Sequence, residues 1–82
     1  MKEEIEKWWK IALDDLETSK YNLEGNRLAA AAFYAQQSVE KALKTLMLHN
    51  GKSFEKTHDI TKLSILVSAP EKIRKLCADI HP

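Results

Sequence analysis

The sequence has few of the residues that break helices and few that form cross-links. It contains two glycines, two prolines and one cysteine in 82 residues. A single cysteine excludes an internal disulfide, and no histidine–cysteine cluster has the spacing of a zinc site. The longest stretch without charge, residues 28–39, has 12 residues, whereas a membrane span needs about 20. The charged amino terminus lacks the apolar segment of a signal peptide. We therefore expect a cytoplasmic protein without metal or cofactor.

Charge and length limit the possible functions further. The net charge is only +1, which argues against a strongly electrostatic nucleic-acid binder. Residues 1–40 carry five basic and eight acidic side chains, and residues 41–82 carry eight and four. This asymmetry is either variation among solvated helix faces or a basic partner surface in the second half. Because so short a chain buries little surface, oligomerisation would add to its stability.

Helical residues and helical periodicity run through the whole chain, which predicts an all-α fold in a single domain of residues 1–82. The expected helices cover residues 3–24, 27–49, a short segment after 59 and a segment from 71. Gly25 is predicted to cap the end of the first helix and Asn26 the start of the second. The expected apolar faces are Ile5, Trp9, Ala12, Leu16, Ser19 and Leu23 in the first helix, and Leu28, Ala32, Ala35, Val39, Ala42 and Leu46 in the second.

The second half of the sequence predicts two shorter helices. Asn50 and Gly51 are expected to end the second helix, and Thr57 or Asp59 can cap the third. Residues 68–71 fit a capping box for the fourth. The expected inward residues are Ile60, Leu63 and Val67 in the third helix, and Ile73, Leu76, Cys77 and Ile80 in the fourth.

Three segments resemble the HEPN domain family. They are Ala-Gln-Gln-Ser-Val-Glu-Lys-Ala-Leu-Lys at residues 35–44, Leu-Met-Leu-His-Asn-Gly at 46–51 and Lys-Thr-His-Asp-Ile at 56–60. The resemblance covers roughly residues 8–67. The family consists of helical domains of bacteria and archaea. The resemblance implies an antiparallel up-and-down helical bundle that commonly forms a homodimer. Members of this branch are often encoded beside a small nucleotidyltransferase in toxin–antitoxin or defence pairs.

Other HEPN branches are metal-independent RNases with an arginine and a histidine separated by four to six intervening residues. Arg74 and His81 fit this spacing, and would supply a cation for the phosphate and a general acid–base group. The alternative is a surface arginine and a frayed terminal histidine. Members of this branch usually extend past 82 residues with a further helix and a Thr-Arg-Tyr-Pro-type segment. By this resemblance we expect a C-terminally shortened domain.

A second candidate site precedes the expected third helix. Lys56, His58 and Asp59 could hold a phosphate, a nucleotide or a partner. The alternative is structural: Asp59 or Thr57 caps the helix, and His58 hydrogen-bonds to the bundle.

Polar residues beside the second helix's apolar face form a third candidate. Gln36 and Gln37 must find hydrogen-bond partners at a helix interface. They indicate a polar groove or a dimer contact, to which Glu40 and Lys41 would belong. The alternative is a satisfied interhelical pair.

The aromatic residues complete the candidate set. Trp8 and Trp9 are adjacent, so one is expected in the core and the other at its edge. Both are candidate dimer contacts, and an exposed Trp8 would be a dimer or partner contact. Tyr21, Phe33 and Tyr34 are expected in the core or at its rim. Three functions remain open: an interaction or regulatory module paired with a nucleotidyltransferase, an RNase using Arg74 and His81, and a nucleotide- or RNA-binding domain without catalysis.

Overall fold

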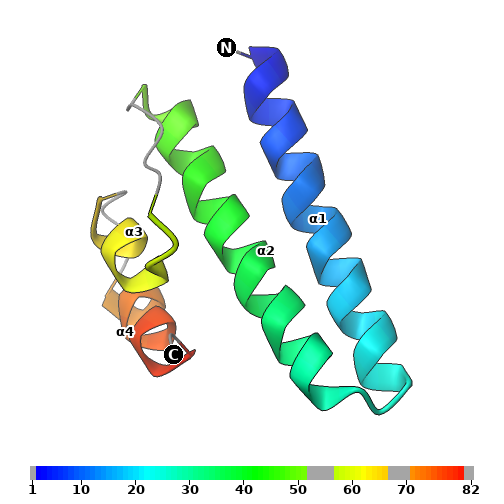
Figure 1. The fold of residues 1–82 in the computed structure, drawn as a ribbon. Helices are drawn as coiled ribbons and strands as arrows, with labels where there is room; N and C mark the ends of the chain where they lie inside the picture. Colours follow the sequence, from blue (N-terminus) through cyan, green and yellow to red (C-terminus); the bar gives the residue numbers. More distant parts are fainter. Residues whose placement is uncertain (1, 52–56, 67–70, 81–82) are drawn as a thin grey trace.

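The chain folds as an antiparallel helical hairpin with two short helices on one side. The computed structural model describes residues 2–51, 57–66 and 71–80. These residues form α1 (Lys2–Glu24), α2 (Leu28–His49), α3 (Ile60–Leu66) and α4 (Glu71–Ile80). α3 and α4 lie on the far side of α2 from α1 (Figure 1). The predicted all-α class is confirmed, while the expected capping box at residues 68–70 and the position of Val67 lie outside the described residues.

The turn between α1 and α2 is closed by backbone hydrogen bonds. The Asn26 amide donates to the Leu23 carbonyl at 3.0 Å, and the Arg27 amide donates to the Asn22 carbonyl at 2.8 Å. This is the pattern of a Schellman motif. Its left-handed residue is Asn26, with φ 59°, and not Gly25. The N-cap position of α2 belongs to Arg27, which makes no side-chain cap hydrogen bond, so the predicted N-cap at Asn26 is wrong.

The turn geometry predicts that substitutions at Asn26 and Gly25 change the protein's stability in the opposite way from what the predicted cap at Gly25 suggests. Asn26→Gly should stabilise the protein by about 0.5–1 kcal/mol, because glycine adopts the left-handed conformation without strain. Gly25→Ala is the control. Its Cβ would meet only the Tyr21 and Asn22 carbonyl oxygens, at 3.6 and 3.8 Å, so stability should hold or rise slightly. Urea unfolding measures both, and a loss of stability in Asn26→Gly, or a clear loss in Gly25→Ala, would contradict the assignment.

α1 and α2 pack through small residues and cross-helix hydrogen bonds. Ala12 and Ala31 are buried. The Ser19 hydroxyl donates to the Ala31 carbonyl at 2.7 Å, and the Ser38 hydroxyl donates to the Ala12 carbonyl at 2.8 Å. Small side chains let the two backbones approach closely, and each hydrogen bond adds roughly 1 kcal/mol. Four large apolar residues of α1, Trp9, Leu13, Leu16 and Leu23, are exposed and lie outside this contact.

The apolar core lies elsewhere, between the second half of α2 and α3. Leu43 and Met47 of α2 pack with Ile60 and Leu63 of α3, and the last two are fully buried. The inward positions predicted for Ile60 and Leu63 are confirmed.

The apolar faces predicted for α1 and α2 are largely exposed. Trp9 is 50% exposed, Leu23 59% and Leu28 61%. The predicted faces are therefore confirmed only in part, because Ala12 is buried and Val39 packs against the core while these large residues are exposed. At about 100° per residue, Trp9, Leu13, Leu16 and Leu23 lie between about 30° and 110° around the axis from Ala12 and Ser19, which contact α2.

Two aromatic side chains also lie nearer the solvent than expected. Tyr21 is 77% exposed, so its predicted place in the core or rim is wrong. Phe33 is exposed as well, although its ring packs edge-on against Tyr34 with 5.2 Å between ring centroids. Trp8 is half-buried, whereas its neighbour Trp9 faces outward.

Candidate functional site

A buried charged cluster forms in the second half of α2. The Glu40 side chain is only 2% exposed, and the Lys44 Nζ lies 3.2 Å from its Oε2. Lys41 Nζ lies 3.9 Å from the same oxygen and donates to Gln37 Oε1 at 3.0 Å. The spacing of Glu40 and Lys44 places both on one helix face. Burial of the pair is what distinguishes it from an ordinary surface ion pair.

His58 joins this cluster from the segment before α3. Its Nδ1 lies 3.0 Å from each oxygen of Glu40. Because an ionised carboxylate only accepts hydrogen bonds, Nδ1 is the donor, and the neutral ring then carries its lone pair on Nε2. The imidazole is 80% exposed while its carboxylate partner is buried. Glu40 therefore holds the His58 imidazole at its Nδ1 edge, and the opposite edge of the ring, which carries Nε2, is exposed to solvent.

Local hydrogen bonds fix the backbone that carries His58. Asp59 Oδ1 accepts from the Lys62 amide at 3.0 Å, which is the N-cap contact of α3. The Asp59 amide in turn donates to Thr57 Oγ1 at 3.1 Å. The predicted cap at Asp59 is confirmed, and His58 hydrogen-bonds to the bundle as the structural alternative expects. This cap sets the position of the imidazole over α2.

The cluster satisfies a carboxylate that would otherwise be costly to bury. Removing an ionised group from water costs several kcal/mol unless hydrogen bonds and opposite charge compensate. Glu40 receives Lys44 and His58 directly and has Lys41 nearby. One buried carboxylate is thus approached by two ammonium groups and one imidazole.

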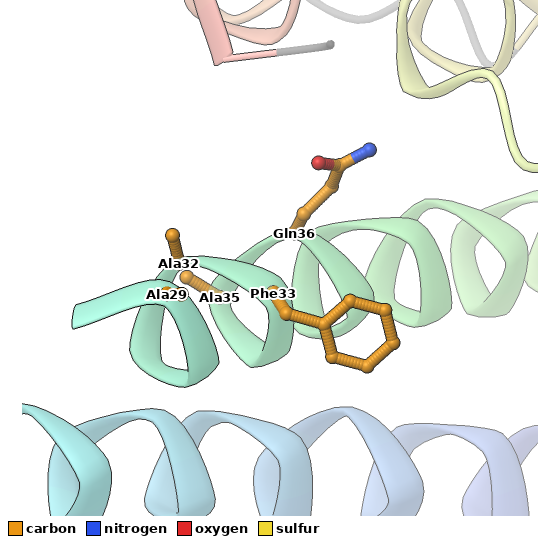
Figure 2. A pocket seen from close by; sticks show the side chains of 5 residues that line it. All are labelled: Ala29, Ala32, Phe33, Ala35 and Gln36. Atoms are coloured by element: carbon orange, nitrogen blue, oxygen red, sulfur yellow. The ribbon is translucent and has the colours of Figure 1, made fainter. Parts of the chain in front are cut away.

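The two neighbouring glutamines face different surroundings. Gln37 belongs to the charged cluster through Lys41. Gln36 lines a hollow of about 350 Å³ on the first half of α2, together with Ala29, Ala32, Phe33 and Ala35. Figure 2 shows Ala32 and Gln36 projecting away from α1. The predicted polar candidates thus divide between two places on one helix.

The remaining candidates are only partly described. Arg74 is exposed on α4, while Lys56 and His81 lie outside the described residues. Lys44, absent from the predicted site, belongs to the cluster; its only sequence signal is its position four residues after Glu40. Among the described residues, no three side chains of the types that bind metals gather at one point. None of the helices in the described ranges combines the length and apolarity of a membrane span.

Comparison with known proteins gives one match. The family model described as HEPN domain matches residues 5–81. No curated protein and no solved structure matches the chain. The matched range includes the α1–α2 hairpin, the charged cluster and His58.

Proposed function

Because this chain belongs to the HEPN domain family, we propose that it is a helical interaction module that forms a homodimer and pairs with a small nucleotidyltransferase, as in toxin–antitoxin or defence systems. One observation carries the proposal: large apolar side chains on the hairpin are exposed to solvent in the described chain. We call them the hairpin face. They are Trp9, Leu13, Leu16 and Leu23 of α1, and Leu28 and Leu46 of α2.

Helix geometry places these six residues on one side of the hairpin. In α1 they lie between about 30° and 110° around the axis from the residues that contact α2, with a mean of about 65°. Leu28 and Leu46 lie about 70° from the α2 residues that contact α1, in the same sense of rotation. Because the two helices are antiparallel, equal rotations in the same sense bring both rows to one side. The face is therefore continuous across α1 and α2.

The hairpin face has the size that a stable dimer needs. α1 is roughly 34 Å long, and two packed helices are roughly 20 Å wide, which gives roughly 700 Å². A standard interface buries about 800 Å² per partner. Trp9 and Leu23 are each seven residues from Leu16. With Leu16 at a two-fold axis, Trp9 of one copy would lie opposite Leu23 of the other, so the face is self-complementary.

The hollow on α2 offers a second surface for the nucleotidyltransferase. It lies about 70° farther around α2 than the hairpin face. Its lining of small residues and one exposed aromatic ring suits an amphipathic helix of a partner. Since the two surfaces are adjacent but separate, one chain could bind a second copy and a nucleotidyltransferase together.

The proposal requires a small nucleotidyltransferase encoded beside this chain, and calorimetric titration with that protein tests the pairing. We expect Ala32→Arg, which fills the hollow, to weaken binding by about tenfold or more. Ala78→Arg is the matched control, because Ala78 is an exposed alanine on α4 outside the hollow. Equal binding by both variants, or no binding by the unaltered chain, would argue against the pairing.

The catalytic alternative has a separate readout. An interaction module should not cleave RNA in the presence of EDTA. Cleavage by the unaltered chain that is lost in both Arg74→Ala and His81→Ala would replace the proposal with a metal-independent RNase.

A further inference from the structure

His58 differs from an ordinary surface histidine in how its ring is held. Both oxygens of the buried Glu40 carboxylate lie 3.0 Å from Nδ1. The ring itself is 80% exposed. His49, at the end of α2, is also exposed but has no hydrogen bond to a described residue. Residues 2–51 and 57–66 thus contain one oriented imidazole, His58, and a second exposed one, His49, to compare with it.

The geometry points to His58 as a phosphoryl acceptor, with Nε2 as the nucleophile and Glu40 as the group that positions it. A carboxylate on Nδ1 fixes the tautomer and the ring orientation, so the lone pair faces outward on Nε2. Such an oriented pair is a common arrangement for nucleophilic and acid–base chemistry. No described residue hydrogen-bonds to Nε2. The inference does not depend on the proposed dimer or nucleotidyltransferase.

Charge around the ring favours an anionic donor. The Lys44 and Lys41 ammonium groups lie 3.2 and 3.9 Å from Oε2 of Glu40, the carboxylate that holds the imidazole through Nδ1. Ammonium groups attract phosphoryl oxygens and stabilise the charge that gathers on them during transfer. A small anionic phosphoryl donor is therefore the chemical class that fits.

The transfer step balances without any other reactant. The Nε2 lone pair forms a bond to the phosphorus of the donor. The bond from phosphorus to the leaving group breaks, and the leaving group departs with its electron pair. The Nδ1 proton passes to the Glu40 carboxylate, which leaves a neutral imidazole with the phosphoryl group on Nε2. Nothing is oxidised or reduced.

Phosphoramidate is a suitable probe, because its leaving group is ammonia. We expect the unaltered chain to gain one acid-labile phosphoryl group, measured by intact mass and located by proteolytic mapping. His58→Asn should lose this modification, and His49→Asn should keep it. His58 should react faster than His49 by about tenfold or more, in line with an oriented and activated nitrogen.

Glu40→Gln tests the positioning role, with circular dichroism to check its fold. The unaltered chain should give only the Nε2 isomer in ³¹P–¹H spectra, because Glu40 occupies Nδ1. A folded Glu40→Gln chain should react about tenfold more slowly and give a mixture of isomers. Equal rates at His58 and His49, or no reaction at His58, would overturn the inference. If Glu40→Gln does not fold, the loss of the phosphoryl group expected in His58→Asn still tests the inference.

Discussion

Leu16→Glu should convert the dimer into a monomer. At the proposed two-fold axis, the substitution brings two carboxylates together in an apolar interface, where neither has a counter-charge. Like charges and unpaired buried ions each cost several kcal/mol in such a position. We expect the dissociation constant to rise by about 100-fold or more, equivalent to about 2.7 kcal/mol. Light scattering over a dilution series measures the change.

Tyr21→Glu is the matched control for this substitution. Tyr21 lies on the same helix and is 77% exposed, but it points about 140° away from Leu16 around the axis. The variant should remain a dimer with an unchanged dissociation constant. Circular dichroism should show equal helicity in both variants. Equal dissociation in both would mean that the hairpin face is not the interface.

Glu40→Leu should cost about 3–5 kcal/mol of unfolding free energy. It leaves the buried Lys44 ammonium without its carboxylate and removes the acceptor of His58. Loss of one member of a buried ion pair typically costs this much. A domain of this length has roughly 4–12 kcal/mol of total stability, so the effect should be plain in urea unfolding.

Two controls separate burial from charge. The double variant Glu40→Leu with Lys44→Leu should recover most of the loss, because apolar replacement of both partners often restores stability. Glu17→Ala breaks the exposed contact to Lys20, where the charged atoms lie 3.6 Å apart, and should change stability by at most about 0.5 kcal/mol. A Glu40→Leu effect as small as that of Glu17→Ala would contradict the buried cluster.

The parts of the fold that depend on local signals could be predicted from sequence. Ile60 and Leu63 share one face by spacing, and Asp59 has the side chain of an N-cap. Gly51, with φ 74°, ends α2 where Asn50 and Gly51 predict it. Each of these features depends on residues within about one helical turn.

The inward face of α1 could not be predicted in the same way. Trp9 and Leu16 recur at the same helical period as Ala12 and Ser19, so periodicity alone does not separate the two rows. The choice comes from the hydrogen bond between Ser19 and Ala31, which joins residues 12 apart in sequence. Hydrophobicity favoured the large residues, whereas close backbone packing favoured the small ones.

The sequence predicted only part of the site, because the contact between Glu40 and His58 and the burial of Lys44 have no local sequence signal. The sequence singles out Glu40, Lys41 and His58, but not that Glu40 and His58 meet across 18 positions. In the sequence, Lys44 resembles half of an exposed helical ion pair, whereas in the fold it is buried. Burial of a charge is a property of the packed helices, and no local pattern reports it.

Cross-linking through Leu16 tests the central proposal most directly. Leu16→Cys in a Cys77→Ser background leaves one cysteine per chain, and Tyr21→Cys in the same background is the control. If the hairpin face joins two copies about Leu16, mild oxidation should convert Leu16→Cys almost entirely into a disulfide-linked dimer while Tyr21→Cys stays monomeric on a denaturing gel. A monomeric Leu16→Cys chain, or equal cross-linking of both variants, would contradict the account.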